Sequence, residues 1–302
     1  MMIAVLGSAN IDLVFQVERL PRFGETIAGK SYNRFPGGKG ANQAAACGRL
    51  RADVVFLGKV GDDPFGEELL RSLQNSGVNV DYVKREEGVY TGTTAIFVSP
   101  SGENAILYLA GANRHVDEAY VDTVLDVIMS SSVLLMQFEI PITTIAYLLR
   151  KLPPAKPLVI LDPAPAYSLS SLPTNRIDII TPNVTELESL TGTSNVEIGG
   201  KKLLNTGVKH VICKVGEEGA WLIARDQIRH FPSFHVPVVD TTAAGDAFNG
   251  ALAVALAEGL SLEEGIVWGN AAGALACTRR GAQPSLPFRE EVEKFLALYK
   301  HK

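Results

Sequence analysis

The sequence contains few cysteines and no tract of basic residues, and each of these absences excludes a class of protein. Its three cysteines, Cys47, Cys213 and Cys277, are far apart and lie in apolar stretches, which predicts buried reduced thiols and excludes a disulfide framework. The five histidines show no spacing typical of zinc ligands. The formal net charge is -5 and lysine and arginine form no run, so we expect no nucleic acid as a partner.

From the sequence we also expect neither a targeting segment nor a membrane span. The first residues, MMIAVLG, have no basic lead-in and are too short for a signal sequence or a membrane span. We therefore expect a cytoplasmic protein without a membrane partner. Internal repeats, low-complexity tracts and linkers are absent as well, and 46% of the 302 residues are hydrophobic. These features predict a single domain over residues 1–302 with a large core.

What the sequence does contain is a series of short apolar runs that alternate with helical stretches. The predicted strands are Ile3–Leu6, Val54–Val60, Val133–Phe138, Leu158–Leu161, Ile177–Thr181 and Val208–Val215. The predicted helices are Ala41–Leu50, Pro64–Gln74, Asp117–Met129, Ile142–Leu152, Glu186–Thr191, Ala247–Glu258, Leu262–Cys277 and Phe288–Leu298. Unbroken apolar strands between helices are typical of a parallel sheet covered on both faces. We therefore predict a doubly wound α/β fold, whose mostly parallel central sheet binds ligands beyond the carboxyl ends of its strands.

Two segments interrupt this alternation. Residues 18–36 are polar and strand-like, and Thr93–Leu109 has the pattern of a hairpin around the turn PSGEN. They can form a small second sheet, inserted as a lid from segments of about 13–36 and 89–110, or they can be two ordinary surface loops. We favour the lid. A second hairpin is predicted at residues 220–231.

The stretch Gly24–Ser31 reads GETIAGKS and matches the pattern of a phosphate-binding loop, G-x-x-x-x-G-K-[ST]. Such a loop needs a buried strand before it and a helix after it. The preceding residues are polar and contain Pro21, while the following residues have no helical period and meet Pro36. We therefore interpret the match as a coincidence inside a lid strand.

The sequence DTTAAGDAFNGAL, residues 240–252, marks the start of a helix that carries Asp246 in its first turn. An aspartate at this place can cap the helix, because its carboxylate accepts hydrogen bonds from free amides. It can equally act as a catalytic base, because the small residues Ala243, Ala244 and Gly245 leave backbone amides open to a phosphate group. This stretch alone does not decide between the two roles.

Polar side chains also follow several of the predicted strands. Asn10 and Asp12 lie just past the first strand and on one side of the chain, a pattern that suits paired sugar hydroxyls. Glu139 follows a later strand, and the glycine-rich turn PGGKGAN brings Lys39 and Asn42 to the start of a helix. Each of these features is also compatible with an ordinary strand end or turn.

The segment TPNVTELESL places Asn183 and Glu186 three residues apart at the start of a helix. There they can hold phosphate and magnesium-bound water, or they can form a capping pair. The nearby stretch KVGEEGA, residues 214–220, is a glycine-flanked turn between strands.

Five motifs along the chain, GSANID, GGKGAN, TPNVTE, VDTTAAGDAFNG and TRRGAQPS, together resemble the ribokinase branch of the ribokinase-like sugar kinases. The resemblance covers essentially the whole chain and keeps the order of the motifs. It implies an α/β core with a small β-lid and transfer of the γ-phosphate of ATP to the 5-hydroxyl of D-ribose. The alternative is a kinase of a related acceptor: 2-deoxyribose, fructose, a ketodeoxy sugar acid or a nucleoside.

The resemblance also implies roles for residues at matching positions. Asp246 is the implied base, and the amides of Ala243, Ala244 and Gly245 are the implied anion hole. The implied sugar ligands are Asn10, Asp12, Gly38, Lys39, Asn42 and Glu139, together with the base. The implied nucleotide site contains Asn183, Lys214, Gly216, Gly219, Gly245 and Asn270, with Glu186 placing Mg²⁺ through water.

A monovalent-cation site completes what the resemblance implies. A K⁺ activator site, built largely from backbone carbonyls, is matched by Asp240, Thr242, Ala276, Arg279, Gly281 and Ser285. Because the lid strands leave sheet edges that need covering, we expect a homodimer that pairs lid to lid.

Two residues depart from the family pattern. Val184 stands where a glutamate is usual, and we expect at most a modest change in the handling of magnesium. Lys214 stands where an uncharged hydroxyl residue is common. Its side chain can reach a phosphate or simply lie at the surface.

Overall fold

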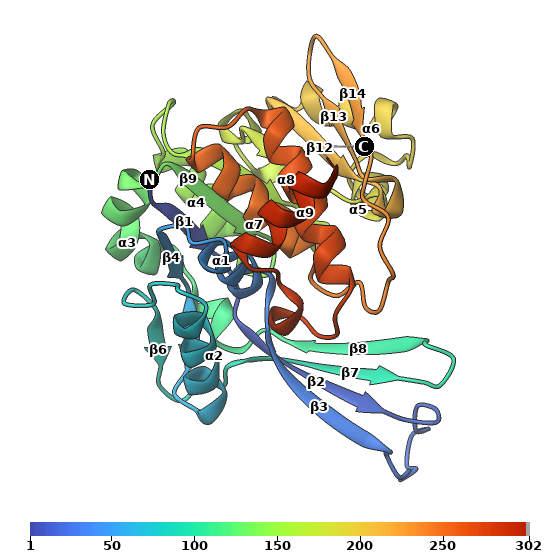
Figure 1. Ribbon diagram of the computed structural model, residues 1–302. Helices are drawn as coiled ribbons and strands as arrows, with labels where there is room; N and C mark the ends of the chain where they lie inside the picture. The colour runs from blue at the N-terminus through green and yellow to red at the C-terminus, as the bar shows by residue number, and fades with distance from the viewer. Residues whose placement is uncertain (300–302) are drawn as a thin grey trace.

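The computed structural model describes residues 1–299 and contains a central sheet of eight strands with helices on both faces (Figure 1). In order across the sheet, the strands are β14 (Ile228–Phe231), β13 (Ala220–Ile223), β12 (His210–Lys214), β11 (Ile179–Ile180), β10 (Leu158–Asp162), β9 (Val133–Gln137), β1 (Ile3–Leu6) and β4 (Val54–Leu57). Neighbours from β4 to β12 are parallel, whereas β13 pairs antiparallel with both β12 and β14. The predicted fold class and the predicted hairpin at residues 220–231 are confirmed.

Each face of the sheet packs against its own layer of helices. In β1, Ile3 and Val5 belong to one hydrophobic cluster while Ala4 and Leu6 belong to the other, so successive side chains are buried on opposite faces. The first cluster includes side chains from α1 (Lys39–Arg49), α2 (Pro64–Asn75), α7 (Ala244–Ala257), α8 (Leu262–Cys277) and α9 (Arg289–Tyr299). The second includes side chains from α3 (Glu118–Ser130), α4 (Ile142–Lys151), α5 (Val184–Thr191) and α6 (Val196–Asn205).

A separate four-stranded sheet projects from the body of the molecule (Figure 1). Its strands are, in order, β3 (Ser31–Gly37), β2 (Asn10–Gln16), β7 (Gly92–Val98) and β8 (Asn104–Leu109). The register places Asp12 opposite Thr94, and Thr94 opposite Tyr108, so these three side chains form one row across the sheet. The predicted lid sheet is therefore present, and its first strand begins at Asn10.

Two local predictions differ from the structure, and one helix was missed. Residues 18–30 form a loop, and of the predicted strand-like segment only the part from Ser31 is a strand. The predicted strand Val54–Val60 is interrupted at Gly58, because β5 (Lys59–Gly61) pairs with β6 (Lys84–Glu86) in a sheet of its own. Helix α6 was not predicted, since its Gly199-Gly200 pair conceals the helical pattern.

The stretch GETIAGKS is not a phosphate-binding loop. Its residues 24–30 have no regular structure, and a lid strand rather than a helix begins at Ser31. Lys30 forms an exposed ion pair with Glu18. The rejection of the motif is confirmed, although all of the match except Ser31 lies in the loop before β3 and not inside the strand.

Short 3₁₀ turns connect several of these elements, at Gly111–His115, Leu169–Ser171, Thr174–Arg176, Gly216–Glu218 and Gln283–Ser285. Within residues 1–299, no helix is both long enough and apolar enough to cross a membrane.

Candidate active site

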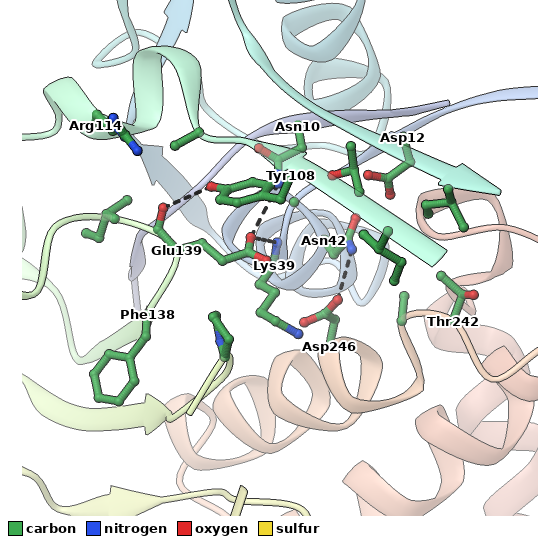
Figure 2. Close-up of a pocket in the computed structure, with 18 of the residues that line it drawn as sticks. Asn10, Asp12, Lys39, Asn42, Tyr108, Arg114, Phe138, Glu139, Thr242 and Asp246 are labelled. Carbon is green, nitrogen blue, oxygen red and sulfur yellow. Dashed lines mark hydrogen bonds between the residues drawn. The ribbon is translucent and has the colours of Figure 1, made fainter. Parts of the chain in front are cut away.

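A cavity of about 780 Å³ lies where the lid meets the carboxyl ends of β9 and β10 and the first turns of α1 and α7. Figure 2 shows polar side chains from the lid, from the chain after β9 and from the first turns of α1 and α7 turned toward it. Its lining includes the base and every sugar ligand implied by the resemblance: Asn10, Asp12, Gly38, Lys39, Asn42, Glu139 and Asp246. Ala243 and Thr242 also line the cavity, whereas the implied nucleotide residues do not.

Asp246 is buried in the first turn of α7, and its carboxylate does not cap that helix. The N-cap position is occupied by Ala243, and no side chain caps the helix. Instead, Oδ2 of Asp246 accepts a hydrogen bond from Asn42 Nδ2 at 2.9 Å, and Oδ1 accepts one from Gln43 Nε2 at 3.1 Å. The carboxylate is therefore held by side chains of α1 at the edge of the cavity, which contradicts the capping interpretation.

The backbone before Asp246 adopts a conformation that is costly for a residue with a Cβ atom. Ala243 has a φ of 60° and lies in the left-handed region, which costs about 1–2 kcal/mol for residues other than glycine. Within the described residues, the amides of Ala243 and Gly245 donate to no acceptor, while the amide of Ala244 donates to Thr241 O at 3.2 Å. Two of the three amides implied for the anion hole are thus unpaired, and the third closes a turn. Strain of this kind is typical of functional sites.

Lys39 supplies positive charge beside the carboxylate of Asp246, toward which its side chain is directed (Figure 2). Burial disfavours the charged ammonium, but the carboxylates of Asp246, Asp162 and Glu139 outweigh this and raise the pKa of Lys39. Burial raises the pKa of Asp246 to about 6, although Lys39 opposes the rise. Asp246 is therefore ionised at neutral pH with a proton affinity close to that of an efficient general base.

The opposite wall of the cavity presents carboxylates and amides from the lid and from the end of β9. Glu139 Oε2 accepts hydrogen bonds from Ser8 Oγ at 2.5 Å, from the amide of Lys39 at 3.1 Å and from Asn10 Nδ2 at 3.4 Å. Burial raises the pKa of Asp12 to about 7, partly offset by a hydrogen bond with Thr94. A ring of such groups suits a ligand with several hydroxyls, because carboxylates accept and amides donate hydrogen bonds.

The implied nucleotide and magnesium residues lie outside this cavity. Asn183 and Glu186 form a capping box at the start of α5, with each side chain bonded to the other's amide at 2.8 Å. Burial raises the pKa of Glu186, and the nearby ammonium of Lys214 opposes this rise. Asn270 Nδ2 donates to the carbonyls of Phe231 and Pro232, at 3.0 and 3.2 Å. Asn183 and Glu186 therefore form the capping pair that was one of their two predicted roles. Their nucleotide role stays a prediction.

The implied K⁺ residues connect the loop before α7 to the turn after α8. Asp240 Oδ1 accepts hydrogen bonds from the amide and hydroxyl of Thr242, while its Oδ2 accepts one from the amide of Gly281 at 2.9 Å. Arg279 pairs with Glu291, and Ser285 Oγ donates to a carbonyl at 2.8 Å. Ala276, the remaining member of the set, is fully buried near the end of α8. Side chains alone do not make a metal site here, since residues 1–299 contain no cluster of three or more His, Cys, Asp or Glu that could hold a metal.

Several residues of the site were not identified from the sequence. Gln43 Nε2 bridges Asp246 and Asp162, and its oxygen accepts from Gln137 Nε2 at 2.7 Å. The other unanticipated residues near the cavity are Thr94, Tyr108, Asn113 and Arg114. Asp162 ends β10, so the rule that ligands bind beyond strand ends could have found it. Gln43 and Gln137 gave no such signal, because each lies within an apolar or small-residue stretch.

Comparison with known proteins gives consistent results over nearly the whole chain. A family model described as "pfkB family carbohydrate kinase" matches residues 1–289. The chain is 37% identical over 302 residues to the ribokinase of Haemophilus influenzae, which covers 97% of this chain and 98% of the relative. It is 33% identical over 302 residues to the deoxyribokinase of Salmonella typhi, and the match covers 98% of this chain and 99% of the relative. A solved structure of Arabidopsis thaliana ribokinase complexed with ribose and ATP is similar with a TM-score of 0.92 at 35% identity, covering 98% of both chains.

Proposed function

This chain belongs to the pfkB family of carbohydrate kinases, and from that premise we propose that it transfers the γ-phosphoryl group of ATP to the 5-hydroxyl of D-ribose. The observation that carries the proposal is the common cavity of Asp246 with Asn10, Asp12 and Asn42. It combines a buried base with hydrogen-bonding groups suited to a small polyhydroxylated ligand. Similarity to ribokinases over the full chain supports the choice of sugar.

In the proposed reaction, Asp246 takes the proton of the sugar hydroxyl as its oxygen attacks the γ-phosphorus of ATP. A bond forms between that oxygen and phosphorus, and the bond from phosphorus to the β–γ bridging oxygen breaks. ADP leaves with the electron pair of the broken bond, and Asp246 later releases its proton to water. The unpaired amides of Ala243 and Gly245 stabilise the charge on the phosphoryl oxygens.

The sugar is proposed to bind between the lid and α1. Asn10, Asp12, Asn42 and Glu139 bond to its hydroxyls, and the backbone at Gly38 allows the ring to approach closely. Lys39, whose pKa is raised, stays charged beside the base and stabilises the transferred negative charge.

The nucleotide is proposed to lie along Asn183, Lys214, the turn with Gly216 and Gly219, Gly245 and Asn270. Glu186 suits a water-mediated Mg²⁺ contact, because one carboxylate oxygen caps α5 while the other makes no hydrogen bond within the described residues. Mg²⁺ prefers oxygen ligands and keeps several waters and substrate phosphates, so a single protein carboxylate is sufficient. When bound, Mg²⁺ neutralises charge on the phosphates of ATP.

The experiment that tests this proposal measures ATP consumption with Mg²⁺ and K⁺ across D-ribose, 2-deoxyribose, fructose and adenosine. We expect D-ribose to give the highest kcat/KM. Deoxyribose is the second candidate, because a deoxyribokinase is 33% identical to this chain. If another acceptor leads, the assignment of the sugar fails while the kinase chemistry stands. If ribose binds and no acceptor reacts, the protein is a sugar sensor and not a kinase.

The pH dependence of the reaction follows from the two carboxylates with raised pKa values. Asp246 must be ionised to accept a proton, and Asp12 must be ionised to accept sugar hydroxyls as a carboxylate. We therefore expect kcat/KM for the sugar to fall below about pH 7, near the pKa of Asp12, and more steeply below about 6, near that of Asp246. Initial rates from about pH 5 to 9 test this, and Asp12→Asn should remove the upper inflection. A flat profile across this range would contradict both roles.

Dependence on K⁺ is expected from the Asp240 loop. A cation bound to carbonyls of this loop and of the turn at Gly281 would order the backbone that leads into α7, without contacting the substrates. Replacing K⁺ by Na⁺ should therefore lower activity by about fivefold or more, the lower end of typical coupling between two sites. Rates measured in matched chloride salts at constant ionic strength test this. Equal rates in the two salts would exclude the site.

A homodimer formed through the lid is expected from exposed apolar residues on its edge strand. Ile106, Leu107 and Leu109 of β8 are 61%, 56% and 57% exposed, and β8 has an unpaired edge. Such surfaces are usually covered by a partner. Sedimentation equilibrium should give a mass of about twice the 32.4 kDa of one chain. A monomer at micromolar concentration would contradict this arrangement.

A further inference from the structure

Lys214 is a charged residue at the carboxyl end of β12 whose side chain turns inward and not toward the surface. It is 14% exposed, and its Nζ pairs at 3.1 Å with Oδ1 of Asp162, which is 3% exposed. Asp162 ends β10, so the pair spans the intervening strand β11 at the carboxyl edge of the sheet. This edge is where ligands bind in sheets of this type.

The ammonium of Lys214 also lies beside the first turn of α7. A Cβ atom built on Gly245 would be 3.5 Å from Lys214 Nζ. The amide of Gly245 has no acceptor among residues 1–299, and Gly245 directly precedes Asp246. A cation, an unpaired amide and the positive end of a helix dipole therefore converge beside Asp246, an arrangement that attracts an anion.

The pairing with Asp162 leaves most of the hydrogen-bonding capacity of Lys214 unused. An ammonium has three N–H donors, and the bond to Asp162 is the one side-chain hydrogen bond of Lys214 within the described residues. Asp162 is itself shared, since its other oxygen accepts from Gln43 Nε2 at 2.9 Å. Two donors of Lys214 thus remain for a ligand, while Asp162 fixes where the ammonium lies.

We propose that Lys214 is a further catalytic residue, whose ammonium donates hydrogen bonds to the phosphoryl group as it passes from ATP to the sugar. Asp162 is the positioning residue that holds it beside Gly245. This inference rests on the proposed function and gives a reactive role to a position where related kinases commonly carry an uncharged hydroxyl. In the transfer described above, Lys214 supplies hydrogen bonds and positive charge, while the proton of the sugar hydroxyl goes to Asp246.

The alternative explanation is that Lys214 and Asp162 form a buried ion pair that only stabilises the fold. Variants of Lys214 distinguish this structural role from the proposed catalytic role. In Lys214→Met we expect kcat to fall by about 10²-fold, a usual loss for one transition-state donor, with KM for the sugar nearly unchanged. Lys214→Arg keeps the charge and should recover most of this loss. The control Lys209→Met removes the exposed Lys209–Asp178 ion pair and should leave kcat unchanged. Unchanged kcat in Lys214→Met, with only a lower unfolding temperature, would overturn the proposal.

A second measurement uses the unaltered protein, so it does not depend on how the variants fold. Lysine acylation is mapped by mass spectrometry with and without Mg²⁺-ATP. We expect ATP to protect Lys214 but not the exposed Lys209, and equal modification of Lys214 in both conditions would overturn the proposal. This readout needs no sugar, so it still tests Lys214 if the substrate panel finds no acceptor and the proposed function fails.

Discussion

Asp246→Asn should lower kcat by about 10²–10⁴-fold, the usual range for removal of a positioned general base. An asparagine has nearly the same shape but cannot take the proton of the attacking hydroxyl. Its amide group must also face Asn42 or Gln43, both of which donate to the carboxylate in the native protein. Steady-state kinetics with the best acceptor, together with circular dichroism to confirm the fold, give the measurement.

Asp117→Asn provides the matched control for this variant, because Asp117 is an aspartate that does cap a helix. Its side chain accepts a hydrogen bond from the amide of Tyr120 at the start of α3, at 2.8 Å. Asparagine caps helices about as well as aspartate, so both stability and kcat should be nearly unchanged. A near-normal rate in Asp246→Asn would remove Asp246 from the chemistry and leave the site without its base.

Gly38→Ala should damage both the stability of the protein and the binding of the sugar. Gly38 has a φ of 87°, and a Cβ atom there would lie 2.7 Å from the amide nitrogen of Asn10 and 2.9 Å from the Cα atom of Ala9. The positive φ costs about 1–2 kcal/mol and the overpacking about 1–3 kcal/mol more, so we expect a loss of about 2–5 kcal/mol in the free energy of unfolding. Because Asn10 must shift, KM for the sugar should rise by about tenfold or more.

Gly24→Ala separates the two contributions to this effect. Gly24 also has a positive φ, of 78°, but no atom lies within 4 Å of the position of its Cβ. The free energy of unfolding should therefore fall by about 1–2 kcal/mol, the conformational cost alone, with KM unchanged. Denaturant unfolding and sugar kinetics on both variants make the comparison. Equal losses in the two variants would show that the contact with Asn10 is unimportant.

The fold class was predictable because the central strands are buried on both faces. A strand such as Val133–Gln137 leaves an almost continuous apolar run in the sequence, and a helix pattern follows it before the next run. The small sheets were harder to predict. β5 and β6 have three residues each, too few to show a period, and α6 contains two adjacent glycines that pack against Leu187 and Ile223.

The candidate site was predictable where a polar residue follows a strand or starts a helix, as Asn10, Glu139 and Asp246 do. The candidate site was not predictable where a buried residue forms its hydrogen bond with a residue far away in the sequence. Gln43 bonds to Asp162 across 119 residues, and no local pattern distinguishes it from the alanines that follow it in α1. The sequence also did not show whether Asp246 caps α7 or takes part in catalysis. Only the positions of its hydrogen-bond donors, Asn42 and Gln43, distinguish these roles, and both lie far away along the chain.

The hydrogen bond between Asn42 and Asp246 joins residues 204 positions apart, and this separation has a consequence during synthesis. The ribosome releases the side chains proposed to bind the sugar hydroxyls long before it releases α7. A nascent chain that ends before α7 therefore lacks both the base and the amides proposed to receive the phosphoryl group. Since domains generally fold as units, the proposed site can form only after α7 has been synthesised.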